Sequence, residues 1–501
     1  MKMLNMTTQP EMKTNLPEKI IQFGEGNFLR CFIDWMIKRL NDKNLFNGRV
    51  VAIQPTPHGQ IVGKLNEQDA LYTTILRGIQ NGTTINKAEI INSVSRGINP
   101  YTNWHNVLKC AENPAIEYVF SNTTEAGLTY NNEDTAQMQP PLSFPAKLTL
   151  YLYHRYEYFH GAADKGMYII PCELLEANGD LLKKIILHYC ADWNLPQNFI
   201  NWLNNNNKFY NTLVDRVVSG YPKDEIEELT DKLQYEDKLL VCGEPFHFFA
   251  IEGDEILKEK LPFAKIGLNV VVEKDISKYR QRKVRLLNGG HTANVPAAFL
   301  SGLDTVAQMM DDSTTGRFSR HVINDIILPS INMDKKMLSE FANSVVERFQ
   351  NPFIKHYLLS ILLNSTSKFK VRVLPSLLQY HDKFNKFPDE LLFSFAAYIY
   401  IYKPVRTADN HLYGLRKGQE YELTDNKINI NKLEQAWGLY ANSESTAQQT
   451  AVAIVNDASL WDTDFSVFPE VAETVGSYLY QIDTKGCKAV MKNLLSVGVS
   501  L

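Results

Sequence analysis

A strand, a glycine turn and a helix near the start of the chain constrain its fold more than any other feature. Residues 18–23 predict a strand, Gly24 and Gly26 predict a tight turn, and residues 28–40 carry apolar side chains at helical spacing. In this context the two glycines let backbone N–H groups approach a pyrophosphate at the N-terminus of the helix. Leu29 stands where the usual dinucleotide fingerprint has its third glycine, so a structural turn is the alternative interpretation.

Two further predicted strands end in polar residues of the kind that hold a nucleotide. Residues 49–53 end at Gln54, which can hydrogen-bond a ribose but does not repel a 2′-phosphate, and this favours NAD over NADP modestly. Residues 116–120 run into Ser121 and Asn122, at the carboxyl end of a strand where α/β sheets bind ligands. A capped turn before the next helix explains the same residues. The predicted cofactor-binding residues are Gly24, Gly26, Asn27, Phe28, Gln54 and Asn122.

The pattern of the chain changes near residues 273–278. Strands alternate with helices before that point, whereas helical periodicity dominates after about Tyr279. We therefore predict an α/β fold: a Rossmann-like NAD-binding domain over residues 1–275 and a mostly α-helical substrate and catalytic domain over residues 276–501. A cleft between two such domains is a common place for a substrate.

Composition excludes several classes of protein. With 44% hydrophobic residues and a net charge of −4 over 501 residues, the chain has the makeup of a globular protein and no charge excess for nucleic acid or an anionic membrane. No apolar run reaches the roughly 20 residues that span a bilayer. Six cysteines without CxxC spacing argue against a zinc cluster and fit a reducing cytoplasm. We expect a cytoplasmic protein, monomeric or homodimeric, that takes a small-molecule substrate and no metal.

An amine, an amide and an imidazole lie within nine residues of the predicted second domain, at Lys283, Asn288 and His291. On an α-helix, Lys283 and His291 point within about 80° of each other, and Asn288 lies within about 140° of Lys283. Gly289 and Gly290 allow a ligand or another helix to approach closely. A buried lysine can act as a general acid or base near neutral pH. An amphipathic helix with a solvated lysine and a satisfied histidine is the alternative.

Two other segments carry candidate site residues. Asn178 and Gly179 follow a predicted strand at residues 167–171 and look like a turn dipeptide. Lys368, Lys370 and Arg372 alternate along the chain and suggest one cationic stripe, although most such residues are solvated faces.

Together these segments resemble the polyol-specific long-chain dehydrogenase/reductase family, the mannitol dehydrogenase-like enzymes. The family's lysine, asparagine and histidine are matched by Lys283, Asn288 and His291, and the resemblance runs in order from about residue 18 to about residue 490. Its remaining motifs are matched by Gly24 to Phe28 with Arg30, by Asn178-Gly179, and by residues 211–216. Several segments are most similar to the family's uronate-reducing branch: residues 65–72, 93–101, 121–126, 144–147 and 283–292.

The resemblance implies reversible, metal-independent hydride transfer between NAD(H) and a six-carbon keto-uronate, such as tagaturonate reduced to altronate. It implies that Lys283 is the general acid and base, and that Asn178 and Asn288 donate hydrogen bonds to the reacting oxygen. His291 would orient the lysine or bind the adjacent hydroxyl. The implied substrate-binding residues are Asp215, Lys368 and Arg372, the two cations meeting the carboxylate.

One departure separates this chain from mannitol dehydrogenases. Those enzymes have an arginine eight residues before the lysine matched by Lys368, and here that position holds Ser360. The departure puts mannitol in doubt and suits a substrate with a terminal carboxylate. Three alternatives stay open: a fructuronate reductase, a mannitol, hexitol or hexitol-phosphate dehydrogenase, and a non-catalytic NAD-binding sensor.

Overall fold

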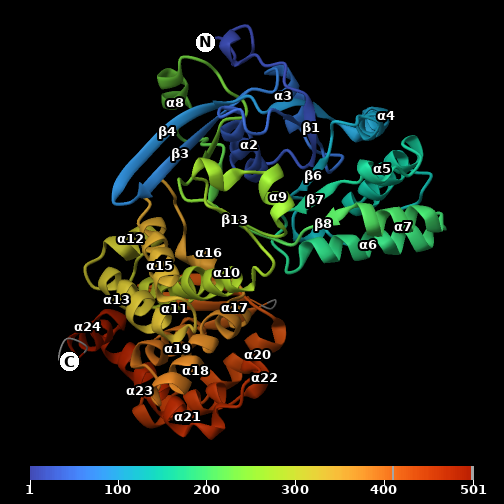
Figure 1. Ribbon diagram of the computed structural model, residues 1–501. Helices are drawn as coiled ribbons and strands as arrows, with labels where there is room; N and C mark the ends of the chain where they lie inside the picture. Colours follow the sequence, from blue (N-terminus) through green and yellow to red (C-terminus); the bar gives the residue numbers. More distant parts are fainter. Residues whose placement is uncertain (409–410, 498–501) are drawn as a thin grey trace. The chain divides into compact units, whose positions relative to one another are not determined.

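The structure, a computed structural model, describes residues 1–408 and 411–497 (Figure 1). The chain divides into two compact units. The first contains residues 1–78 and 84–277, and the second contains residues 79–83 and 278–501. No helix within the described ranges is both long and apolar enough to cross a membrane.

A six-stranded sheet organises the first unit, and every neighbouring pair of its strands is parallel. Its order is β5 (Val94–Ile98), β2 (Arg49–Ile53), β1 (Glu18–Phe23), β6 (Tyr118–Ser121), β7 (Tyr168–Pro171), β8 (Lys208–Phe209). The predicted strands at 18–23 and 49–53 are confirmed at both ends, and β6 begins two residues later than predicted. The chain reverses direction across the sheet between β1 and β6, which is the switch point where such sheets bind ligands.

Helices cover both faces of this sheet, so its strands are buried on both sides. In β1, Ile20 packs in one apolar cluster with Phe32, and Ile21 packs in a second cluster with Leu148. The helices around this sheet are α1 (Asn27–Cys31), α2 (Ile33–Asn41), α3 (Ile61–Glu67), α4 (Pro100–Ala111), α5 (Phe144–Tyr158), α6 (Asn178–Asp192) and α7 (Gln197–Asn206).

The single helix predicted over residues 28–40 is wrong, because the structure has two helices, α1 and α2, that meet at Phe32. Phe32 has φ −125° and ψ −78°, outside the helical region. Its ring stacks on Phe28 with centroids 4.9 Å apart and meets Phe249 edge-on at 5.5 Å. The break therefore accompanies packing against a strand distant in the sequence, which local periodicity does not reveal.

Two smaller sheets complete the first unit. One has the order β10 (Val218–Gly220), β11 (Val241–Gly243), β3 (Tyr72–Gln80), β4 (Thr83–Ile91), and the other β13 (Val270–Glu273), β12 (Phe248–Glu252), β9 (Thr212–Asp215). Helices α8 (Ile226–Leu233) and α9 (Glu255–Lys260) flank them. Residues 266–272 are mostly apolar and strand-like in sequence, but β13 begins only at Val270, since residues 263–266 form a 3₁₀ turn that ends at Gly267 with φ +78°.

The second unit is mostly helical, as the periodicity predicts. Helix α19 (Asp389–Ile401) is buried along nearly its whole length and packs against α11 (Gly289–Leu300). The elements on the N-terminal side of α19 are α10 (Ser277–Arg282), π-helix η5 (Lys283–Asn288), α12 (Val306–Asp311), α13 (Thr315–His321), π-helix η6 (Val322–Ile327), α14 (Leu328–Ser330), α15 (Lys335–Phe349), α16 (Leu358–Leu362), α17 (Ser365–Arg372) and α18 (Leu374–Phe384). Those on its C-terminal side are α20 (Lys427–Trp437), α21 (Glu444–Val455), α22 (Ala458–Trp461), α23 (Pro469–Lys485) and α24 (Cys487–Val497).

Two parts of this unit differ from the sequence prediction. Residues 353–363 have helical periodicity, but only Leu358–Leu362 form a helix, α16, and the Asn351 side chain accepts from the Phe353 N–H in a local turn at the start of the segment. A sheet of β14 (Arg406–Ala408), β15 (His411–Arg416) and β16 (Gln419–Thr424) was not predicted. Its hairpin turns at Lys417 and Gly418, both with positive φ.

All six cysteines are buried and unpaired: Cys31, Cys110, Cys172, Cys190 and Cys242 in the first unit and Cys487 in the second.

Candidate functional site

The two glycines after β1 serve different purposes. Gly24 has φ +125°, and a side chain there would bring Cβ within 3.0 Å of both the Asn122 carbonyl oxygen and the Leu29 side chain. Gly26 precedes α1, and a Cβ built on it meets no atom within 4 Å. Gly24 is therefore required by the turn and by the close packing of β1 against the loop after β6, while Gly26 leaves open space beside the start of α1.

The other residues predicted to bind the cofactor lie around the same turn. Asn27 accepts from Arg30 at 2.7 Å, and Phe28 stacks on Phe32. The Asn122 amide donates to the Cys172 carbonyl at 2.6 Å. Gln54 is buried, and its amide donates to the Thr56 carbonyl at 2.7 Å, so this side chain shapes its own loop.

A cavity of about 560 Å³ opens at the carboxyl edge of the parallel sheet. Pro55 and Thr56 line it after β2, Thr123 lines it after β6, and Leu142 and Phe144 line it at the start of α5. The cavity lies beside the switch point between β1 and β6, where α/β sheets bind nucleotides. None of the six predicted cofactor-binding residues lines this cavity, although Gln54 and Asn122 directly precede the lining residues Pro55 and Thr123.

The segment from Lys283 to Asn288 forms a π-helix, so the predicted α-helical geometry is wrong there. In a π-helix, backbone bonds join residues five apart, and five residues make about one turn plus a small remainder. Lys283 and Asn288 are five apart and therefore share one face, closer together than the about 140° expected for an α-helix. π-turns within helices are frequent at functional sites because they redirect side chains.

Gly289 and Gly290 allow close packing around this turn, as predicted. A Cβ on Gly289 would lie 2.8 Å from the Arg372 carbonyl oxygen at the end of α17. A Cβ on Gly290 would lie 3.2 Å from the Ile323 side chain in η6. The two glycines thus allow α17 and η6 to pack closely against the end of η5.

His291 is held between two rings. It stacks on Phe349 with centroids 3.9 Å apart, and His356 meets it edge-on at 5.1 Å. Burial, with His356, Arg348 and Arg372 nearby, holds the pKa of His291 well below its ordinary value of 6.5. The imidazole is therefore neutral at neutral pH. Neither His356 nor Arg348 is predicted from the sequence as a neighbour of His291, because both approach it through tertiary packing.

The predicted cationic stripe at residues 368–372 is wrong, because the segment is helix α17 and alternate residues of a helix face different directions. Lys370 forms an ion pair with Asp462 at 2.7 Å. Lys368 and Arg372 are four apart and share a face. The Lys368 ammonium donates to the carbonyls of Ile361, at 3.0 Å, and Leu363. Burial and the neighbouring Arg372 lower the pKa of Lys368.

Asn178 and Gly179 begin α6, so the interpretation as a turn dipeptide is wrong. Gly179 is required because a Cβ there would lie 2.5 Å from the Tyr210 backbone. Asn178 is fully buried, and its amide donates to the carbonyls of Pro171 and Glu173 and to the Thr212 hydroxyl, while its oxygen accepts from the Thr212 N–H at 2.8 Å. Its side chain therefore holds β7 to β9. Asp215, the last residue of β9, is also buried.

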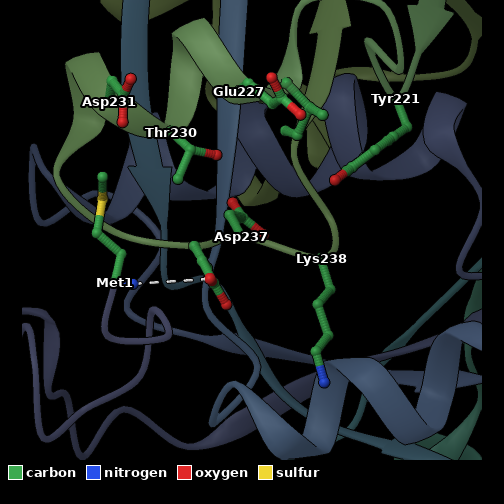
Figure 2. A pocket seen from close by; sticks show the side chains of 9 residues that line it. Met1, Tyr221, Glu227, Thr230, Asp231, Asp237 and Lys238 are labelled. Atoms are coloured by element: carbon green, nitrogen blue, oxygen red, sulfur yellow. Dashed lines mark ion pairs between the residues drawn. The ribbon is translucent and has the colours of Figure 1, made fainter.

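A second hollow of about 530 Å³ in the first unit contains none of the predicted site residues (Figure 2). Glu227, Asp231, Glu236 and Asp237 line it, and the N-terminal amine pairs with Glu236 at 3.8 Å. Within residues 1–408 and 411–497, no three or more His, Cys, Asp or Glu side chains are grouped so that they could hold a metal ion.

The parallel sheet with its switch-point cavity places the first unit in the class of Rossmann-type, nucleotide-binding folds. The mannitol dehydrogenase Rossmann domain matches residues 18–265, and the mannitol dehydrogenase C-terminal domain matches residues 275–483. The chain belongs to the mannitol dehydrogenase family. It is therefore an oxidoreductase that acts on CH–OH groups.

Relatives and solved structures agree with this membership. The altronate oxidoreductase of Halalkalibacterium halodurans is 44% identical over 483 residues, which are 96% of this chain and 94% of the relative. A substrate-free D-sorbitol dehydrogenase superposes with a TM-score of 0.78 at 20% identity, covering 98% of this chain and all of that one. The Pseudomonas fluorescens mannitol 2-dehydrogenase, solved with NAD and D-mannitol, gives 0.68 at 19% identity, covering 99% and 100%. The two structures share the fold of this chain.

Proposed function

We propose that this protein is an NAD-dependent tagaturonate reductase, which interconverts tagaturonate and altronate. The observation that carries the proposal is the π-turn that puts Lys283 and Asn288 on one face, next to a neutral His291 and the cations Arg348 and Arg372. The high identity to an altronate oxidoreductase supports the choice of substrate.

The cofactor is proposed to bind in the first unit, at the glycine turn and the switch-point cavity. Backbone N–H groups at the start of α1 would meet the pyrophosphate, with Gly26 leaving room for it, and the loop after Gln54 would hold a ribose. When bound, NADH supplies the hydride for ketone reduction, and NAD⁺ accepts it in the reverse direction. A solved family structure with NAD supports this assignment.

Proton transfer is assigned to Lys283, and stabilisation of the oxygen to Asn288. Hydride addition to the ketone leaves negative charge on its oxygen, and a fixed amide donor such as Asn288 can stabilise that charge by about 3 kcal/mol. The Lys283 ammonium gives the proton in reduction, and the neutral amine removes it in oxidation. A neutral His291 can accept a hydrogen bond from the ammonium or from the neighbouring hydroxyl, while the proton itself stays with the lysine.

The carboxylate of the substrate is assigned to the cationic face of α17. Arg372 offers a planar fork suited to a carboxylate, and Lys368 keeps one N–H beyond the two that it donates to backbone carbonyls. Asp215 is proposed to accept bonds from sugar hydroxyls. The oxygen-binding role of Asn178 stays a prediction, and its complete set of internal bonds favours a structural role.

Loss of NADH absorbance tests the proposal, measured with tagaturonate, fructuronate and fructose in parallel and repeated with NADPH. We expect rapid oxidation of NADH with tagaturonate and slow oxidation with fructose. Preference for fructuronate or fructose would keep the lysine mechanism and overturn the substrate. Binding of NADH without turnover of any of the three would favour a sensor.

A further inference from the structure

Lys147 is a fully buried lysine that the proposed reaction does not use. It lies in the first turn of α5 (Phe144–Tyr158). Its ammonium donates to the Leu142 carbonyl at 2.6 Å and to the Pro55 carbonyl at 3.4 Å, and it lies 5.1 Å from the centre of the Tyr101 ring. Burying an ammonium group costs free energy, and the hydrogen bonds to these two carbonyls offset part of that cost.

The two carbonyls that accept from Lys147 belong to two residues, Pro55 and Leu142, that both line the switch-point cavity. Pro55 lines the cavity from the loop after β2, directly after Gln54, and Leu142 lines it from the start of α5. The Tyr101 hydroxyl also donates to the Pro55 carbonyl, at 2.9 Å. The Lys147 ammonium therefore bonds to two segments of the cavity lining that are about ninety residues apart in the sequence.

The buried carboxylate of Asp134 bonds to the same segment of the cavity lining, at Leu142 and Ser143. Asp134 accepts from the N–H groups of Leu142 and Ser143 and from the Tyr189 hydroxyl. Leu142 thus gives its N–H to an anion and its carbonyl to a cation. Because opposite charges bond to the N–H and the carbonyl of Leu142, the backbone is held firmly at this point of the cavity lining.

We propose that Lys147 is a positioning residue for the adenosine half of the dinucleotide, acting through Pro55 and Leu142. The inference rests on the proposed binding of NAD in this cavity. The loop that Lys147 fixes is the one that carries Gln54, at the position that holds the adenosine ribose in folds of this order. Lys147 lies beneath the cavity walls and acts without touching the cofactor.

The test compares Lys147→Met with Arg155→Met in the full-length protein. Arg155 is a matched control, since it is buried on the same helix and donates to the carbonyls of Ala111 and Asn113 instead of to the cavity walls. We expect both variants to lower the melting temperature, and only Lys147→Met to raise the Kd for NADH, tenfold or more in a fluorescence titration. Its KM for NADH should rise, with little change in the KM for the keto-acid.

Tyr101→Phe gives a second measurement that does not remove a buried charge. It deletes one of the two donors to the Pro55 carbonyl and should raise the Kd for NADH two- to fivefold. Unchanged NADH affinity in both Lys147→Met and Tyr101→Phe would overturn the inference. Wild-type protein that binds no NADH would instead overturn the proposed cofactor site.

Discussion

The groups that we propose to react in the second unit are few and close in sequence, and they lie in different environments. Lys283 and Asn288 share a face of the π-turn, and His291 follows within the next turn of the helix. The histidine is stacked, partly buried and neutral. A neutral imidazole does not release a proton at neutral pH, so the proton transfer that we propose is assigned to Lys283 and not to His291.

Replacing Lys283 by methionine should therefore abolish catalysis and spare cofactor binding. We expect kcat to fall at least a hundredfold, since general acid–base catalysis contributes about two to four decades. The Kd for NADH should stay within twofold. Lys370→Met is the control, because Lys370 lies in the same unit but pairs with Asp462, and it should keep normal kcat. Near-normal turnover of Lys283→Met would remove the lysine from the mechanism.

The depressed pKa of His291 predicts how stability depends on pH. The unfolded chain binds a proton on this histidine below about pH 6.5, while the folded protein does not. Its contribution to stability is therefore complete above pH 6.5 and is lost as the pH falls, by about 1.4 kcal/mol between pH 7.5 and 5.5.

Urea denaturation of wild type and His291→Gln at these two pH values checks this prediction. The glutamine variant should lose less stability on acidification, by about that amount. His356 and His247, whose pKa values are also lowered, remain in both proteins and do not create the difference. An equal loss in the two proteins would mean that His291 is protonated in the folded state.

At the scale of elements, close approach of backbones decides the geometry of the site. The π-turn, α17 and η6 meet where Gly289 and Gly290 have no side chains. Gly289→Ala would place a methyl group 2.8 Å from the Arg372 carbonyl oxygen, and a backbone atom cannot move away cheaply. We expect a loss of about 1–3 kcal/mol in the free energy of unfolding, and a lower kcat because the lysine turn shifts.

Gly63→Ala is the matched control for this prediction. Gly63 lies in α3, and a Cβ there meets no atom within 4 Å. Alanine should stabilise that helix by about 0.5–1 kcal/mol. Thermal melts and steady-state kinetics on both variants separate crowding at the site from helix propensity. A higher melting temperature of Gly289→Ala than of wild type would show that a methyl group fits at this position without a clash.

How much of these elements the sequence predicts depends on how local the cause is. Strands β1 and β2 are predicted at both ends, since apolar runs bounded by glycine and polar residues are local signals. The π-turn at Lys283, the break at Phe32 and the helix start at Asn178 are not predicted, because each depends on a distant partner. The residue types of the site are therefore predictable, whereas their angles and internal partners are not.

At the scale of the whole molecule, the two units divide the labour of the proposed reaction. The first unit contains the switch-point cavity and the glycine turn. The second unit contains the π-helix η5 with Lys283 and Asn288, and the face of α17 that carries Lys368 and Arg372. Matches to two separate family domains follow the same division. The sequence indicates this organisation through its change from alternating strands and helices to mostly helical periodicity, which is a property of long stretches and is little affected by local errors.

Because every cysteine is buried, the rate at which its thiol is alkylated reports how often that part of the protein unfolds. Burial raises the pKa of Cys110 and Cys242 to about 11 and that of Cys487 to about 12, so the folded thiols stay protonated and shielded from alkylating reagents. Alkylation of these thiols therefore requires local unfolding of the region that buries them. Because Cys487 is in the second unit and the other five are in the first, mapping alkylated peptides over time gives the order in which the units open.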